Sequence, residues 1–354
     1  MDGRLRVGIA GYGVVGRRRR QVVDRHPDLV TVAVCDRRLE GEGAFEDGVR
    51  HYAHYRRMLE AERLDVLLVC LTNDIAAEVT VAGLERSLHV FCEKPPGRDL
   101  ADIARVVAVE ARHPGLVLKY GFNHRYHDSV RDALALVQSG ELGQVVNLRG
   151  VYGKSTIIDF RSPDHWRTRR AVAGGGILLD QGIHMVDLIR LFGGEFDEVH
   201  AFVSNAFWGH DVEDNAYALM RARESGVVAM LHSSATQWRH RFSLDVTLSR
   251  GMLILSGILS GSKSYGAETL TVVWAHPEDA GDPKEQTTRY NQDPSWADEI
   301  AEFAACVRSG QPVRHGSSRE ALKTMEMVYR IYCADPAWKA RWGLDDQIPP
   351  EAAP

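Results

Sequence analysis

The sequence predicts an α/β protein in two parts: a parallel sheet over residues 1–122, and an α/β domain with a large, mostly antiparallel sheet over residues 123–354. The chain has 354 residues, whereas a single hydrophobic core stops growing at roughly 250 residues, so two domains are expected. Short apolar runs alternate with helical patterns in the first third, which is typical of parallel strands joined by helices. Beyond residue 123, alternating runs joined by short turns indicate antiparallel strands.

The first four strands are expected at the runs RLRVGIA, LVTVAVCD, LDVLLVCLT and LHVFCEKP. These runs are apolar enough to be buried on both faces of a sheet. Helices are expected between them, through about residue 25, around 53–63 and around 74–86. A further strand is expected near 116–121.

The second part begins with a helix, the strand VVNLRGVYG and a polar loop. A glycine-led helix is expected at 174–192, and a long loop at 276–295. The expected strands lie near 197–205, 214–222, 226–235, 241–249, 251–256 and 269–275, and the closing helices near 296–309 and 317–333.

The composition is that of a globular protein and does not favour binding to nucleic acid. Hydrophobic residues make up 44% of the chain, and the net charge of −5 lacks the positive excess that a polyanion attracts. The N-terminus has no apolar core of a secretory signal, and no uninterrupted apolar run approaches the ~18 residues of a membrane span. The cysteines form no C-x-x-C pair and are expected to be reduced core thiols. A cytoplasmic protein without nucleic-acid or membrane partners is therefore expected.

The glycines of GYGVVG follow the first expected strand and open the first expected helix. In this context Gly11 permits a tight turn, Gly13 lets the backbone approach a pyrophosphate, and Gly16 lets helix and strand pack closely. The helix N-terminus offers free N–H groups to the anion. Asp36, at the end of the second expected strand, is placed to bind a ribose 2′-hydroxyl. The sequence thus predicts a Rossmann dinucleotide-binding domain, whose cofactor turn consists of Gly11, Gly13, Val14, Val15 and Gly16.

Asp36 favours NAD, because a carboxylate repels the 2′-phosphate of NADP. Arg37 and Arg38 follow it, and an arginine just after this strand can hold that phosphate. NAD is therefore the predicted cofactor, with Asp36 and Arg37 among its contacts, and NADP is the alternative.

Four consecutive arginines follow the glycine turn, at residues 17–20. Successive helical residues point ~100° apart, so the four side chains cannot all hold one phosphate. Arg19 falls on the side that Val15, Val22 and Val23 mark as buried, and the other three arginines are expected in solvent. The hypothesis for Arg19 is a contact with the cofactor pyrophosphate or with the second domain.

Asp180, His184 and Asp187 form a narrow polar stripe on the apolar helix expected at 174–192. At ~100° per residue the three side chains fall within about 60° of one another. The stripe permits three interpretations: the solvated edge of an amphipathic helix, a metal site, or a general base with an orienting carboxylate. No Cys/His cluster in the sequence completes a set of metal ligands, so no metal is predicted.

Glu93 and Lys94 leave the carboxyl end of an apolar strand in the stretch FCEKPPG. Ligands of open α/β sheets bind at that edge, so Lys94 is expected beside the nicotinamide of a bound cofactor. A solvated strand exit is the alternative.

Further motifs extend along the chain, namely GIAGYGVVG, EKPPG, GFNHRY, GGGILLDQGIHMVDLIRLFGG, VEDNAYALMR and GSSREALKTMEMVYRIY. Together they resemble the Gfo/Idh/MocA family of sugar and cyclitol oxidoreductases over nearly the whole chain. The resemblance implies a Rossmann domain and a C-terminal α/β domain whose open sheet mediates dimers or tetramers. It also implies hydride transfer between a secondary alcohol carbon of a carbohydrate and nicotinamide.

The resemblance further implies a catalytic set of Lys94, Asp180 and His184. In the oxidation direction His184 takes the hydroxyl proton, Asp180 orients the imidazole, and Lys94 stabilises the developing alkoxide. The stretch LTNDIAAE departs from the family pattern T-P-N-x-x-H by lacking its proline and histidine. The additional cofactor contacts implied are Thr72, Asn73, Glu93 and Lys94.

Arginine and tryptophan gather in the polar loop before the glycine-led helix and again around residue 238. These side chains suit a sugar that bears phosphate or nucleotide diphosphate, through forked hydrogen bonds and stacking. The alternative is that the arginines lie in solvent or in subunit contacts and that the substrate is a neutral amino sugar or a cyclitol. The predicted substrate contacts are Lys94, Asn123, Arg125, Arg161, Trp166, Arg167, Asp180 and His184.

The predicted function is that of an NAD-dependent dehydrogenase or ketoreductase for a sugar, nucleotide sugar, sugar phosphate or cyclitol, acting as a homodimer or homotetramer. Two alternatives remain: a redox-neutral epimerase that keeps NAD tightly bound, and a non-catalytic dinucleotide-binding sensor. The set of Lys94, Asp180 and His184 argues against the sensor.

Overall fold

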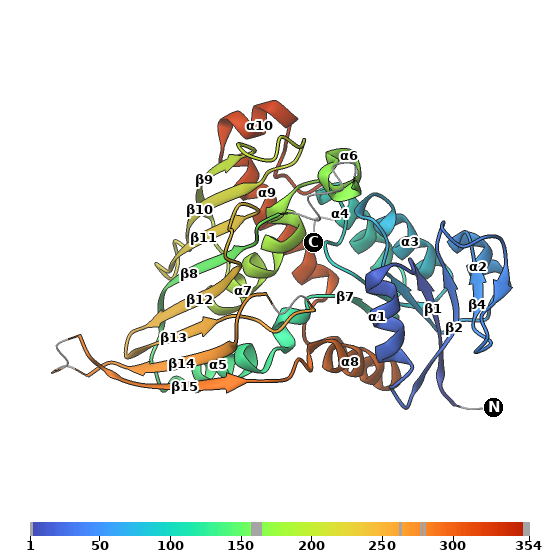
Figure 1. Cartoon of the computed structure of the whole chain (residues 1–354), viewed down its shortest axis with the longest axis horizontal. Coiled ribbons are helices and arrows are strands. Elements are labelled where there is room, and N and C mark those ends of the chain that lie inside the picture. The colour runs from blue at the N-terminus through green and yellow to red at the C-terminus, as the bar shows by residue number, and fades with distance from the viewer. Residues whose placement is uncertain (1–2, 157–164, 262–263, 277, 279–280, 350–354) are drawn as a thin grey trace. The chain divides into compact units, whose positions relative to one another are not determined.

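The computed structural model describes residues 3–156, 165–261, 264–276, 278 and 281–349. The chain divides into two compact units (Figure 1). The first unit consists of Met1–Asn123, Trp296–Lys323 and Ile348–Pro354, and the second of His124–Ser295 and Thr324–Gln347. The chain thus leaves the first unit close to the boundary expected from the sequence, but it returns to that unit at Trp296, which the sequence pattern did not indicate.

Within the described residues, a seven-stranded sheet forms the centre of the first unit, in the order β3-β4-β2-β1-β5-β6-β7. Strands β4, β2, β1, β5, β6 and β7 pair in parallel, so the predicted parallel sheet is confirmed. The short edge strand β3, antiparallel to β4, was not expected. The strands are β1 (Leu5–Ala10), β2 (Leu29–Cys35), β3 (Gly43–Ala44), β4 (Arg50–Tyr52), β5 (Val66–Val69), β6 (His89–Cys92) and β7 (Leu118–Tyr120).

The helices of the first unit come from its two longer stretches of chain, Met1–Asn123 and Trp296–Lys323. Ile300 and Phe303 of α8 join the core formed by strand residues such as Ile9 and Phe91, and the Phe303 and Phe91 rings lie 5.7 Å apart. The returning segment therefore completes the hydrophobic core of this unit. The helices are α1 (Val14–Val23), α2 (Tyr55–Ala61), α3 (Asn73–Glu85), α4 (Leu100–Glu110) and α8 (Ser295–Ser309).

In the described part of the second unit, eight strands form one sheet in the order β15-β14-β13-β12-β8-β11-β10-β9. Strands β8 and β11 pair in parallel and the other neighbours antiparallel, which confirms the expected mostly antiparallel sheet. The strands are β8 (Val145–Gly153), β9 (Glu198–Ser204), β10 (Asn215–Arg221), β11 (Val228–Ser234), β12 (Arg241–Leu248), β13 (Gly251–Ser256), β14 (Glu268–Trp274) and β15 (Lys284–Tyr290).

The prediction of a long loop at 276–295 was wrong, because β15 lies within it. The strand sequence KEQTTRY has no apolar alternation, and its side chains are almost all exposed. It is an edge strand that is held by its backbone pairing with β14. Periodicity of hydrophobic residues cannot detect such a strand, because neither of its faces is buried.

Helices α5 (Asp128–Ser139) and α7 (Ile183–Gly193) lie along one face of the second sheet (Figure 1). At Gly150 of β8 an added Cβ would lie 2.7 Å from the sulfur of Met185, so the absence of a side chain lets α7 approach the strand closely. The remaining α-helices with residues in this unit are α6 (Arg170–Ala173), α9 (Ser318–Cys333) and α10 (Pro336–Trp342).

The helix expected at 174–192 is present, but it begins only after residues 174–176 and starts with a π-helical turn. Helix α6 ends before Gly174, a π-helical turn covers Leu178–Gly182, and α7 follows. Gly176 packs against the connection between β9 and β10. A Cβ at Gly176 would lie 2.1 Å from the carbonyl oxygen of Glu213 in that connection. The buried carboxylate of Glu213 accepts hydrogen bonds from the backbone N–H groups of Gly176 and Leu178, at 2.7 and 3.0 Å. Uniform spacing of 100° per residue therefore does not hold over this segment.

The stretch Arg170–Gly193 is, within the described residues, the one helical segment long and apolar enough to cross a membrane. Its most apolar window is 83% buried inside the structure, which is the property of a core helix.

Candidate active site

Strands β2, β1, β5 and β6 are neighbours and run parallel, so their carboxyl ends meet at one edge of the first sheet. The predicted cofactor residues follow these ends: Gly11 after β1, Asp36 after β2, Thr72 after β5 and Glu93 after β6. The strand order changes direction at β1, because β2 lies on one side of it and β5 on the other. Such a switch point is where open α/β sheets bind dinucleotides.

The glycine turn leaves no room for side chains at two of its three glycines. Gly11 has a φ of +92°, and a Cβ there would lie 2.2 Å from the carbonyl oxygen of Cys70. A Cβ at Gly16 would lie 1.9 Å from the carbonyl oxygen of Gly11. A Cβ at Gly13, by contrast, would meet nothing closer than Nη2 of Arg38 at 3.5 Å. Gly13 is also the N-cap of α1, so the free N–H groups of the helix start at this glycine.

Asp36 is held by hydrogen bonds from the backbone and from a neighbouring arginine. Its Oδ2 accepts a hydrogen bond from the backbone N–H of Tyr12 at 2.9 Å, and Arg38 binds both carboxylate oxygens at 2.8 Å. The hydrogen bonds from the Arg38 side chain outweigh the effect of burial and lower the pKa of Asp36 to about 2. Asp36 is therefore a charged acceptor throughout the physiological range, and Arg38, not Arg37, is the arginine that contacts it.

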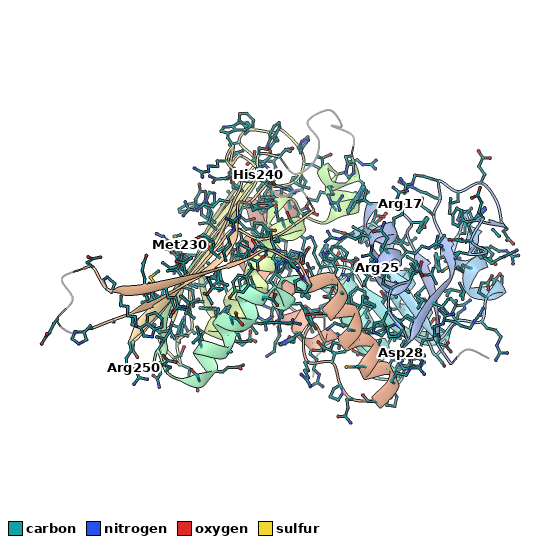
Figure 2. The ribbon with its side chains drawn as sticks, turned by 60° about the horizontal axis from the view of Figure 1, so that its bottom comes forward. Arg17, Arg25, Asp28, Met230, His240 and Arg250 are labelled. Atoms are coloured by element: carbon teal, nitrogen blue, oxygen red, sulfur yellow. The ribbon has the colours of Figure 1, made fainter. Side chains whose placement is uncertain are left out.

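The four arginines of α1 divide in part as helical periodicity predicts. Arg17, labelled in Figure 2, is exposed, and Arg19 is fully buried. Arg18 and Arg20 are only half-exposed, so the expectation that both lie free in solvent was wrong. The Arg18 guanidinium lies 4.0 Å from the ring centre of Trp296, and Arg20 donates a hydrogen bond to the Tyr12 hydroxyl at 2.8 Å.

Two further predicted cofactor residues begin helix α3. Thr72 is its N-cap, and its hydroxyl donates a hydrogen bond to Asp74 at 2.5 Å. Asn73 is the first residue of the helix and is buried. Of the two valines in the glycine turn, Val14 is exposed and Val15 is half-buried.

In the second unit, Asp180 lies in the π-helical turn and is paired with two cations. Its Oδ1 accepts a hydrogen bond from Nε of Arg167 at 2.9 Å, and its Oδ2 lies 3.5 Å from Nζ of Lys154. The Arg167 guanidinium is also 4.4 Å from the ring centre of Trp166. Three residues singled out from the sequence, Asp180, Arg167 and Trp166, thus lie together, and Lys154 joins them.

His184 is buried on α7, and its imidazole stacks on that of His124 with ring centres 3.8 Å apart. Nε2 of His124 lies 3.1 Å from the hydroxyl of Tyr152. Burial, followed by the nearby Tyr265, raises the pKa of Tyr152 well above its ordinary value, so its hydroxyl remains protonated. Sequence reasoning missed His124 and Tyr152, although His124 stands within the quoted motif GFNHRY.

Asp187 does not form one group with Asp180. Nε and Nη2 of Arg125 donate to its two carboxylate oxygens at 2.7 and 2.6 Å, and the Thr324 hydroxyl donates to it at 3.2 Å. The same hydroxyl accepts from Nη1 of Arg190 at 2.6 Å. Asp187 is thus the centre of a buried network that ties α7 to α9. A substrate contact of Arg125 stays a prediction.

The remaining predicted substrate residues lie in different parts of the chain. Asn123 is buried at the last position of the first segment of unit 1. Arg161 lies outside the described residues. Lys94 belongs to the first unit, whereas Asp180 and His184 belong to the second. Among the described residues, no group of three His, Cys, Asp or Glu side chains is arranged to hold a metal ion.

Comparison with protein families identifies the chain. Residues 5–122 match the oxidoreductase family with an NAD-binding Rossmann fold, and residues 130–254 match the GFO/IDH/MocA C-terminal domain. The chain belongs to the Gfo/Idh/MocA family. It is an oxidoreductase whose first unit holds the NAD-binding Rossmann domain, so the predicted family, cofactor class and fold class are confirmed.

Similar proteins include sugar and cyclitol dehydrogenases. Myo-inositol 2-dehydrogenase from Thermotoga maritima is 25% identical over 316 residues, which are 87% of this chain and 90% of that protein. Levoglucosan dehydrogenase from Pseudarthrobacter phenanthrenivorans is 27% identical over 186 residues, which are 52% of this chain and only 45% of that protein. A solved structure of levoglucosan dehydrogenase with NADH and L-sorbose has a TM-score of 0.81 at 18% identity, covering 94% of this chain and 97% of that chain. At this identity the structural likeness shows the shared fold.

The glycine turn yields a prediction with an internal control. Gly16→Ala places a Cβ against the carbonyl oxygen of Gly11, so α1 must shift, and we expect the free energy of unfolding to fall by about 2 kcal/mol. Gly13→Ala meets no close atom and should change it by less than about 0.5 kcal/mol, while weakening NADH binding. Chemical denaturation and NADH fluorescence titration measure the two quantities. Equal stability losses in both variants would contradict the packing argument.

Proposed function

We propose that the protein transfers a hydride between a secondary alcohol or ketone carbon of a carbohydrate and NAD, with Lys94, Asp180 and His184 as its catalytic residues. The main support is the buried His184 of α7, which stacks on His124 and follows the π-helical turn that carries Asp180. A histidine titrates near neutral pH, so it can exchange a proton with a substrate hydroxyl. The cofactor, when bound, supplies the carbon that accepts or returns the hydride.

In the oxidation direction, His184 takes the proton of the substrate hydroxyl. The stacked ring of His124, held by the Tyr152 hydroxyl, limits the orientations that the His184 imidazole can adopt. Asp180 contributes negative charge that stabilises the imidazolium. The Lys94 ammonium stabilises the alkoxide oxygen as it develops. In the reduction direction the same groups act in reverse, with His184 as the acid.

The preferred cofactor follows from Asp36. Its carboxylate is charged at neutral pH and accepts hydrogen bonds, which suits a ribose 2′-hydroxyl and repels a 2′-phosphate. The glycine turn and the start of α1 bind the pyrophosphate, with Thr72, Asn73, Glu93 and Arg37 as neighbouring contacts. NAD is therefore the proposed cofactor.

The proposed substrate class is a sugar with an anionic substituent, such as a sugar phosphate or a nucleotide sugar. Two cations, Arg167 and Lys154, lie at the carboxylate of Asp180, and such groups bind phosphate oxygens through charge-assisted hydrogen bonds. Trp166 adds an aromatic face beside Arg167, which suits the apolar face of a sugar ring. Asn123, Arg125 and Arg161 are proposed as further substrate contacts.

The exposed face of the second sheet supports a homodimer or homotetramer. Three large apolar side chains on neighbouring strands β9 and β10 are strongly exposed: Phe202 at 81%, Leu219 at 56% and Tyr217 at 50%. Met230, labelled in Figure 2, lies on the same face of the adjacent strand β11 as Val228. Such a patch on a sheet face is typical of a subunit interface.

We place the protein in the cytoplasm, where the five cysteines, all free thiols in the described chain, stay reduced.

Replacing His184 tests the proton transfer. We expect His184→Ala to lower kcat by a factor of about 10² to 10⁴, because the hydroxyl proton loses its acceptor, while the dissociation constant for NADH stays unchanged. The assay measures NADH formation with a panel of sugars, sugar phosphates, nucleotide sugars and cyclitols. His54→Ala, an exposed histidine of the first unit, is the control. A His184→Ala enzyme with near wild-type kcat would refute the role, and substrate conversion without net NADH formation would indicate an epimerase.

Replacing Asp36 tests the cofactor preference. Asp36→Ala removes an acceptor of the ribose hydroxyl, so we expect kcat/KM with NAD to fall by about tenfold. It also removes the repulsion of the 2′-phosphate, so kcat/KM with NADP should rise. Initial rates with both cofactors give the ratio. A clear NADP preference of the unmodified protein would contradict the assignment.

A charge on the exposed sheet face tests the oligomer. Leu219→Asp should shift the protein toward monomers in sedimentation velocity, because a buried interface does not tolerate an unpaired carboxylate. Phe207→Asp changes a residue of similar exposure outside the strands and serves as control. A wild-type protein that sediments as a monomer would exclude this interface.

A further inference from the structure

Arg19 joins three segments of the first unit that are distant in sequence. Its Nε donates to Oε1 of Glu93 at 2.5 Å, and its Nη2 donates to Oε2 of Glu299 at 2.7 Å. Its guanidinium also lies 4.5 Å from the ring centre of Phe91 and 4.1 Å from that of Trp296. The side chain has no exposed surface, so a bound pyrophosphate cannot reach it in this conformation.

A gain in the free energy of folding does not by itself explain why Arg19, Glu93 and Glu299 meet inside the protein. A guanidinium and carboxyl groups taken out of water lose hydration, and apolar side chains of similar size are often neutral or stabilising in such positions. Burial lowers the pKa of Arg19, but the two carboxylates raise it by more, so the guanidinium stays charged. Burial raises the pKa of Glu299 to about 7, against the opposing effects of Arg19 and Lys119. A buried ion group of this kind fixes geometry more clearly than it stabilises the fold.

The geometry that it fixes is the chain just before Lys94. The backbone N–H of Glu93 donates to the carbonyl oxygen of Val69 at 2.9 Å, which holds the main chain at the end of β6. A Cβ at Gly121 would lie 3.0 Å from Oε2 of Glu93 and 3.3 Å from Nη2 of Arg19, so the carboxylate sits against bare backbone. The side chain of Glu93 is thus confined between Arg19 and Gly121, one residue away from Lys94.

We propose that Arg19 is a positioning residue for Lys94: through Glu93 it fixes the turn that presents the lysine, and through Glu299 it makes that turn depend on the docking of helix α8. The proposal rests on the proposed function, in which Lys94 contacts the reacting oxygen. An error of about 1 Å in the position of such a group can reduce the rate 10²-fold, so a rigid mount has a catalytic consequence.

A double-mutant cycle tests whether Arg19 acts through Lys94. Arg19→Lys keeps the charge but loses the two-pronged contact with Glu93 and Glu299, and we expect kcat to fall by about tenfold or more. The dissociation constant for NADH should stay within about threefold, since Arg19 does not reach the cofactor. In a Lys94→Ala background the same change should alter kcat by less than about twofold, because the positioned group is gone.

Arg17→Lys, an exposed neighbour on the same helix, is the matched control and should leave kcat, NADH binding and thermal stability unchanged. If Arg19→Lys does not fold, Glu299→Ala gives the same test, because it removes the acceptor on α8 to which Arg19 donates. Undiminished kcat in the folded variant, or equal losses with and without Lys94, would overturn the proposal. A Lys94→Ala enzyme with wild-type kcat would instead show that the proposed function is wrong, so the two failures are distinguishable.

Discussion

The close packing of α1 against the turn after β1 is the constraint on which the first unit depends. Gly16 lies so near the carbonyl oxygen of Gly11 that no side chain fits between them. This contact directs the start of α1 to the carboxyl edge of the sheet, where its free N–H groups can meet an anion. It also sets the rotation of the helix, which brings Arg19, one turn later, to the buried side.

Each unit contains a buried arginine that ties its key elements together. In the first unit Arg19 joins α1, the end of β6 and α8, and in the second Arg125 joins the segment after β7 to α7 through Asp187. Both arginines bind carboxylates that are distant in sequence. Removing one partner of such a pair leaves an uncompensated charge inside the protein, so these contacts specify one arrangement of the elements.

Much of the first unit could be predicted from sequence, because strands buried on both faces are continuous apolar runs and the glycine turn has a specific spacing. Strand β15 and the π-helical turn could not. The first has no buried face, and the second depends on the contacts of Gly176 and Glu213, which come from different parts of the chain. In the site, Asp36 and His184 stood out by position, whereas the partners of Asp180 and the stacking of His124 on His184 required the fold.

The sequence by itself determined the elements whose signals are local: the βαβ pattern, the glycine turn, the acid at the end of β2, and the family motifs. Only the tertiary structure decided which charges meet. Arg19 was one of four arginines in a row, and helical geometry showed that it points inward but not what it meets. Its partner Glu299 lies 280 residues away on a helix that the chain returns to the first unit, and no local pattern encodes a contact between such distant side chains.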